Sequence, residues 1–211
     1  MWPVIEPSTP FLDSWHLGAI CEHEAAVLEG DIPKLLINVC PRSGKSITTS
    51  VAFPTWAWTR DPSTRFLYSS YSGDLSLEFS TSSRHVLESS WYQSRWGVKL
   101  STDQATKSFY ANDQGGYRIS TSVGGSATGR GGDVLVLDDP HNLKLVASDV
   151  IRNADIEWFR KVWSSRQNNP KFGRQIVIMQ RGHQDDLAAM LLEQGDWVCL
   201  KLPTEYIPRQ W

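Results

Sequence analysis

One stretch decides the fold: residues 34–46, with the sequence KLLINVCPRSGKS. Its first half, 34–39, is short and apolar and lies between turn-forming residues, which indicates a buried strand. The residues after it predict a helix over about 45–58. The Gly-Lys-Ser triplet at 44–46 therefore connects a strand to a helix, and in that position it is typical of a phosphate-binding loop.

Each residue of this loop has a predicted role toward a nucleotide. Backbone N–H groups of the turn and of the helix N-terminus would face the phosphates, and the helix dipole would add to the attraction. Gly44 lets the backbone approach closely, Lys45 would reach the β- and γ-phosphates, and the Ser46 hydroxyl would bind Mg²⁺. The predicted nucleotide-binding residues are Pro41, Arg42, Ser43, Gly44, Lys45 and Ser46. Val39 stands where such loops usually begin with glycine, so the general pattern is only half met, and an ordinary surface triplet is the alternative.

A second candidate site lies at residues 134–139, VLVLDD, where an apolar strand ends in two carboxylates. Carboxylates are costly in a core unless they meet a cation or a partner. Ligands of open α/β sheets gather at the carboxyl ends of the strands. Asp138 would then hold Mg²⁺ through water, and Asp139 would orient or deprotonate the attacking water. The alternative is a helix-capping pair in a turn opened by Pro140.

The rest of the chain alternates strands with helices. Residues 1–12 are rich in proline and predict an extended arm. The helix predicted over 13–29 should bury Leu17, Cys21, Ala25 and Leu28, and the helix over 148–166 should bury Ile151, Ala154, Trp158 and Val162. The other predicted elements are a helix at 74–89, strands at 65–71, 175–179 and 197–202, and a hairpin of 108–111 with 117–122. This pattern predicts an α/β fold with a mostly parallel central sheet flanked by helices on both faces.

Composition limits the partners. The 211 residues carry a formal net charge of −2, which argues against a generally basic, nucleic-acid-coating surface. The three cysteines are widely spaced without a metal-ligand pattern, so we expect reduced thiols. No stretch approaches about 18 apolar residues, and the N-terminus lacks the charge pattern of a signal peptide, so no membrane partner is expected.

With both motifs in place, the chain resembles the ATPase domain of the large terminase subunit of tailed bacteriophages, the DNA-packaging motor. The resemblance runs from about residue 11 to residue 203. It rests on the order and spacing of Trp15-His16, the variant Walker A loop 40–46, Phe53-Pro54-Thr55-Trp56, the segment 125–132 (GSATGRGG), Asp138-Asp139-Pro140 and the segment 180–187 (QRGHQDDL). It implies a P-loop nucleoside-triphosphatase with ATP and Mg²⁺ as cofactors.

The resemblance also implies roles for single residues. Arg42 would sense the phosphates, Asp138 would be the magnesium carboxylate, and Asp139 would stand in the catalytic-glutamate position with a shorter side chain. Gln180 and Arg181 would form the coupling motif, which reports on the γ-phosphate, at the end of a strand between the P-loop strand and the Asp138 strand. The alternative for this segment is a polar turn that caps the following helix.

Arg130 is implied as a catalytic arginine finger. Its glycine-rich surroundings predict an exposed loop, suited to inserting the arginine into the site of a neighbouring copy, in trans. The alternative is a solvated charge on a tight turn, and Arg166 is the competing finger candidate.

The function that the resemblance implies is ATP-driven translocation of double-stranded DNA into a procapsid. The implied partners are the DNA, other copies of the chain in a ring that is usually pentameric, the portal protein and the small terminase subunit. The implied location is the host cell cytoplasm and not the mature virion. The 211 residues are expected to be one ATPase domain, with the nuclease domain and DNA cleavage absent. Two alternatives stay open: a helicase-like nucleic-acid-dependent ATPase, and a nucleotide-gated assembly module with negligible turnover alone.

Overall fold

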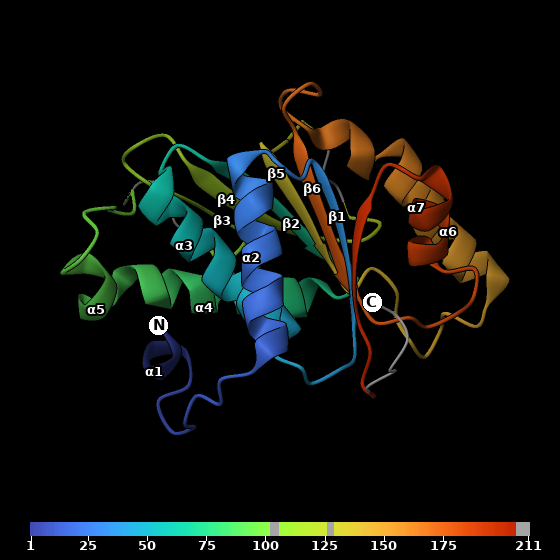
Figure 1. The fold of residues 1–211 in the computed structure, drawn as a ribbon. Helices are drawn as coiled ribbons and strands as arrows, with labels where there is room; N and C mark the ends of the chain where they lie inside the picture. Colours follow the sequence, from blue (N-terminus) through green and yellow to red (C-terminus); the bar gives the residue numbers. More distant parts are fainter. Residues whose placement is uncertain (102–105, 126–128, 206–211) are drawn as a thin grey trace.

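A mostly parallel β-sheet forms the middle layer of the molecule (Figure 1). The computed structural model describes residues 1–101, 106–125 and 129–205. Within these ranges the sheet has seven strands in the order β3-β4-β2-β5-β6-β1-β7, and the β3–β4 pair is antiparallel. The strands are β1 Lys34–Val39, β2 Arg65–Ser70, β3 Phe109–Ala111, β4 Tyr117–Ser122, β5 Val134–Asp138, β6 Arg174–Met179 and β7 Val198–Leu202. The sheet confirms the predicted α/β class.

Helices cover both faces of the sheet, as predicted (Figure 1). On one face lie α2 (Trp15–Glu29), the π-helix η1 (Ile47–Ala52), α3 (Phe53–Arg60) and α4 (Gly73–Glu88), and on the other α6 (Asp149–Lys161) and α7 (Leu187–Gln194). The shorter helices are α1 (Trp2–Ile5), α5 (Ser90–Gln93) and the 3₁₀ turn η2 (Trp163–Arg166). No helix in the described ranges is long and apolar enough to cross a membrane.

The apolar run of β1 is explained by burial on both sides. Successive side chains of a strand point to opposite faces. Leu35 and Ile37 therefore join the core under α2 to α4, and Leu36 joins the core under α6 and α7. A strand buried on both faces shows no regular alternation of polar and apolar residues, which is why a mainly apolar run, with Asn38 as its one polar inner residue, predicted it correctly.

The predicted inward faces of two helices are only partly correct: Leu28 is buried as predicted, whereas Cys21 and Ala154 are exposed. In α2 the buried residues are Ile20, Glu24, Val27 and Leu28, because a carboxylic acid occupies a central inward position and interrupts the apolar stripe. Leu17 packs instead near the phosphate-binding loop, where its Cδ2 lies 3.3 Å from the place of a Cβ on Gly44. In α6 the buried residues are Arg152, Ile156 and Phe159, again because a long polar side chain turns inward.

Two segments differ from the predicted secondary structure. The arm expected to be extended contains the short helix α1, which accommodates Pro3 because the first turn of a helix needs no N–H donor there. The helix expected over 45–58 opens into the π-helix η1 before continuing as α3. Pro54 lies at this junction and lacks a backbone N–H, so an unbroken α-helical ladder cannot form across it.

Candidate active site

The phosphate-binding loop holds an uncommon backbone conformation. Among the described residues other than glycine, positive φ angles occur only at Arg42 (60°) and Asp139 (46°). Arg42 is in the loop between β1 and η1, and Asp139 directly follows β5. Residues held in this region of backbone space cost free energy and cluster at functional sites. The two strained residues therefore mark the same place that the motifs predicted.

A histidine from α2 holds the loop in place. The Nε2 of His16 lies 2.9 Å from the Ser43 carbonyl oxygen, and its Nδ1 lies 2.7 Å from the Ser14 hydroxyl. A carbonyl only accepts, so Nε2 carries the hydrogen and Nδ1 accepts from Ser14. Ser43 lies 27 residues from His16 in the chain, a distance over which no local pattern identifies a contact.

Lys45 and the two aspartates meet, as predicted. Lys45 is only 5% exposed, and its ammonium group forms ion pairs with Asp139 and, at 3.6 Å, with Asp138. The strand order brings them together, because the carboxyl ends of β1 and β5 open onto the same edge with β6 between them. The predicted placement of the β6 strand is thus confirmed. Ammonium and carboxylate groups at one point can neutralise phosphate, hold a cation and accept a proton.

Asp138 is buried and receives two hydroxyl donors. The hydroxyls of Ser46 and Ser50 donate to its two oxygens at 3.0 and 2.8 Å. Burial raises the pKa of Asp138, and the nearby Lys45 ammonium opposes that rise. The helix-capping alternative is wrong, because the next helix, α6, has Ser148 at its N-cap. Ser50 was not predicted, although its spacing of four from Ser46 places both on one helix face.

These residues fit the chemistry of magnesium. Mg²⁺ prefers oxygen ligands, keeps several waters, and is held by one or two carboxylates together with substrate phosphates. Ser46 and Asp138 supply a hydroxyl and a carboxylate within hydrogen-bonding distance of each other. In the described ranges no group of three or more His, Cys, Asp or Glu residues could form an all-protein metal cage. Such a donor set suits an ion that is shared with a nucleotide.

A cavity lies beside the loop. It has a volume of about 900 Å³ and opens between the N-terminal arm, the start of α2 and the phosphate-binding loop. Its lining includes Phe11, Leu12, Leu17, Arg42, Gly44 and Ile47. Ligand pockets are usually apolar with a few placed polar groups, and this one adjoins the loop that would hold the phosphates.

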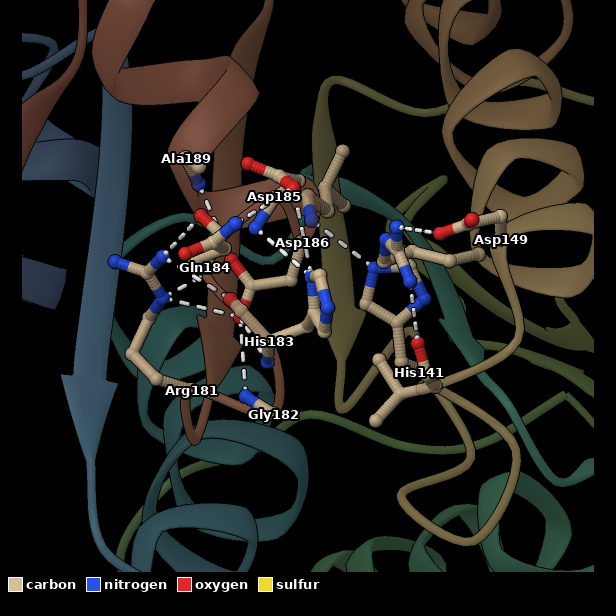
Figure 2. Close-up of polar contacts among 12 residues, drawn as sticks. His141, Asp149, Arg181, Gly182, His183, Gln184, Asp185, Asp186 and Ala189 are labelled. Carbon is tan, nitrogen blue, oxygen red and sulfur yellow. Dashed lines mark hydrogen bonds and ion pairs between the residues drawn. The ribbon is translucent and has the colours of Figure 1, made fainter.

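The segment 180–186 after β6, here called the coupling turn, is held together by hydrogen bonds among its own residues (Figure 2). Asp186 is fully buried, and its carboxylate accepts hydrogen bonds from Arg181 Nε at 3.0 Å, from the backbone N–H of Gly182 and from that of Ala189. Arg181 also donates to backbone carbonyls of the same turn. The alternative of a polar turn that caps the following helix is therefore confirmed for Arg181 and Asp186. Gln180 lies half-buried at the carboxyl edge, directly after β6.

A second histidine links the two motifs. The Leu187 backbone N–H donates to His141 Nε2 at 3.0 Å, so Nδ1 carries the hydrogen and donates to Asp155 at 2.8 Å. His141 follows Asp139 by two residues, and Leu187 begins α7. The loop after the aspartates is thus tied to the helix after the coupling turn. Nothing in the sequence around His141 indicated this contact.

The two finger candidates lie away from Lys45. Arg130 is exposed, and its guanidinium lies 5.7 Å from the ring centre of Phe109. The carbonyl of Arg166 accepts from the Gly132 N–H at 3.0 Å. Gly132 precedes the amino end of β5, whereas Asp138 is at its carboxyl end. Residues 126–128 of the predicted finger loop lie outside the described residues.

In this molecule β1 leads through a phosphate-type loop into a helix, and β5, two strands away from β1 in the sheet, ends in carboxylates. This arrangement defines a P-loop nucleoside-triphosphatase fold.

The sequence matches no family model and no curated protein. Similar solved structures include the following three. The HK97 bacteriophage large terminase has a TM-score of 0.58 at 12% identity, over 96% of this chain and 42% of that protein. The large terminase of the thermophilic bacteriophage D6E, in complex with ATP-gamma-S, has a TM-score of 0.52 at 14% identity, over 85% of this chain and 43% of that protein. The ATPase domain of the Thermus phage P74-26 large terminase has a TM-score of 0.54 at 10% identity, over 95% of this chain and 83% of that protein.

This chain therefore has the fold of the ATPase domain of phage large terminases, and the resemblance that the motifs indicated is confirmed at the level of the fold. It spans less than half of the HK97 and D6E proteins.

Proposed function

We propose that this chain is the ATP-hydrolysing motor domain of a viral terminase large subunit, which drives double-stranded DNA into a procapsid. The observation that carries the proposal is the meeting of Lys45 with Asp138 and Asp139 beside a strained phosphate-type loop. Similarity of fold to terminases, one of them solved with ATP-gamma-S, supports ATP as the nucleotide.

In the proposed reaction, a water oxygen attacks the γ-phosphorus, the bond to the β–γ bridging oxygen breaks, and ADP leaves. Asp139 orients the water and takes its proton. Lys45 and Arg42 neutralise phosphate charge, and Gly44 and the neighbouring backbone N–H groups hold the phosphates. Mg²⁺, held by Ser46 and Asp138, would stabilise charge on the phosphate oxygens. The base of the nucleotide would enter the cavity lined by the N-terminal arm.

The assembly is part of the same proposal. DNA translocation requires several copies acting in a ring, which we expect to be pentameric, on the portal protein, with the small terminase subunit delivering the DNA. This work would take place in the host cell cytoplasm. Gln180, at the edge between β1 and β5, would transmit the loss of the γ-phosphate to the coupling turn.

Steady-state ATP hydrolysis by the purified chain tests the enzymatic step. Asp139→Asn should lower turnover by roughly 100-fold or more while nucleotide binding persists, and Lys45→Ala should abolish both. Nucleotide binding without measurable Asp139-dependent turnover would instead favour the nucleotide-gated assembly module. Strand separation by the pure protein without a capsid would favour the helicase-like alternative.

Mixed oligomers test the arginine finger. A finger supplied in trans raises the rate of other P-loop enzymes by roughly 10³–10⁵-fold, so the isolated chain should be slow and its specific activity should rise with protein concentration. Arg130→Ala copies keep Lys45, and Lys45→Ala copies keep Arg130, so the mixture should recover activity that neither parent has. A mixture as inactive as its parents under assembling conditions would make Arg166 the better candidate.

A further inference from the structure

The helix after the phosphate-binding loop begins with a widened turn. In η1 the N–H of Phe53 donates to the carbonyl of Thr48, five residues back. Pro54 has no N–H, so it supplies neither the α-helical bond to Ser50 nor the π-helical bond to Thr49. Insertions of this kind are frequent at functional sites.

Side chains from the sheet take over these two carbonyls. The hydroxyl of Tyr68, in β2, donates to the Thr49 oxygen at 3.0 Å. Nη1 of Arg118, in the neighbouring strand β4, donates to the Ser50 oxygen at 2.6 Å and to the Ser83 hydroxyl of α4 at 2.8 Å. Side chains from two adjacent strands, β2 and β4, therefore hydrogen-bond to the widened turn.

Ser50 forms hydrogen bonds through both its backbone carbonyl and its side-chain hydroxyl. Its carbonyl receives Arg118, and its hydroxyl donates to Asp138 at 2.8 Å. The hydroxyl of Ser46, one turn earlier, donates to the other oxygen of the same carboxylate. The place of the Ser50 backbone consequently fixes the orientation of the Asp138 carboxylate.

Packing alone does not account for Arg118. The residue is 1% exposed and forms no ion pair with any carboxylate in the described part of the chain, and its guanidinium carbon lies 3.9 Å from the ring centre of Tyr68. Burying a charge without a carboxylate is unfavourable. An apolar side chain of similar length would fill the same space without that cost, but it would remove the hydrogen bond to the Ser50 carbonyl.

We propose that Arg118 is a positioning residue of the nucleotide site, which acts through the Ser50 carbonyl to hold the Asp138 carboxylate in the pose that receives Mg²⁺. This inference rests on the proposed function, because it assigns Asp138 to magnesium. Arg118 itself forms no hydrogen bond or ion pair with the loop at 40–46 or with Asp138; its hydrogen bonds go to Ser50 and Ser83.

A double-mutant cycle with Arg118→Met and Ser50→Ala tests the proposal. Each single variant should raise the Mg²⁺ concentration for half-maximal ATP hydrolysis by roughly tenfold, the size expected for one hydrogen bond to a charged group, with little change in the KM for ATP. The double variant should be no worse than either single one. Ser83→Ala is the matched control: it removes the other partner of Arg118 and should change the Mg²⁺ requirement by less than about twofold.

Amide hydrogen exchange of residues 47–53, without nucleotide, gives a readout independent of activity. Arg118→Met should accelerate exchange there by roughly tenfold, and Ser83→Ala should not. If Arg118→Met fails to fold, Arg118→Lys, which keeps one cationic donor, should fold and retain most of the protection. Equal exchange in folded Arg118 variants and the wild type, additive effects in the cycle, or a Ser83→Ala variant that reproduces Arg118→Met would each overturn the inference. A wild type that is inactive even at high protein concentration under assembling conditions would refute the proposed function, whereas the exchange result still decides whether Arg118 holds the turn.

Discussion

The phosphate-binding loop at 40–46 and the coupling turn at 180–186 lie on the same edge of the sheet, yet they satisfy their basic residues in opposite ways. Lys45 pairs with carboxylates that belong to the end of β5, and Arg42 is exposed. Arg181 pairs with Asp186, five residues further along the same turn. The first loop depends on distant residues, and the second is organised by its own sequence.

The two segments are therefore stabilised differently: one by ion pairs to distant residues, the other by ion pairs within the segment. A loop that must receive a charged ligand keeps its cations near groups that a ligand can replace. The turn at 180–186, for which we propose a coupling role, would serve that role better when rigid, because a rigid element carries a displacement over its length. Substitutions in the coupling turn should therefore mainly lower the free energy of unfolding. Substitutions in the phosphate-binding loop should mainly weaken ligand affinity.

The largest expected effect is in the coupling turn. Asp186→Asn removes the charge that Arg181 and three backbone N–H groups share, inside a fully buried position. The free energy of unfolding should fall by about 2 kcal/mol, since these hydrogen bonds lose their charged acceptor, whereas Arg181 is partly exposed and can be hydrated. Urea denaturation followed by tryptophan fluorescence measures this. Asp185→Asn changes an exposed neighbour and should cost less than about 0.5 kcal/mol; equal effects of the two variants would contradict the role of Asp186.

Beneath the phosphate-binding loop, Glu24 should make stability depend on pH. Burial raises its pKa from 4.5 to about 8, and the Asp138 charge adds to the rise. The folded state favours the neutral acid, so this contribution to stability is fully present below about pH 4.5 and is lost as the pH rises through about 8. Glu24→Gln stays neutral and should be more stable than the wild type at pH 9, but not at pH 4.

Thermal melting of both proteins between pH 4 and pH 9 measures the difference. Glu22→Gln is the matched control, because Glu22 lies on the same helix and is exposed. Its melting temperature should follow that of the wild type at every pH. If the advantage of Glu24→Gln did not grow with pH, Glu24 would be ionised in the folded protein.

The smallest expected effect concerns the support of the phosphate-binding loop. His16→Leu removes the hydrogen bond to the Ser43 carbonyl, so the dissociation constant for ATP should rise by roughly fivefold, the equivalent of about 1 kcal/mol, with little loss of stability. Titration with a fluorescent ATP analogue measures it. His23→Leu breaks a contact within α2, to Ala19, and should leave nucleotide affinity unchanged. Similar losses of affinity in both variants would indicate damage to the helix instead of the loop.

Strands and motif positions could be predicted because they are local. The 34–39 run, the carboxylates that end 134–138 and the hairpin around residues 113–116 each carry their signal within a few residues. The convergence of Lys45 with Asp138 followed from a general rule about strand ends. The placement of β6 between β1 and β5 followed from the family resemblance.

The supporting contacts could not be predicted, and the reasons are physical. Glu24 and Arg152 turn inward against their polarity, so the apolar stripe that identifies a helix face is interrupted. His16 reaches Ser43 across the fold, and Arg118 reaches the Ser50 carbonyl from another strand. Such contacts depend on where elements lie in space, and a π-turn changes the register of a helix without changing its composition.

The strand order has a consequence for how the protein is made. β2 pairs with β4 and β5, which are both made before β6, so that half of the sheet can assemble as synthesis proceeds. Within the described ranges β1 pairs only with β6 and β7, and the chain must be made beyond residue 174 before either exists. Non-local parallel pairing of this kind folds slowly and leaves strand edges open to aggregation. The strand that leads into the phosphate-binding loop is thus among the first to leave the ribosome and among the last to find its neighbours.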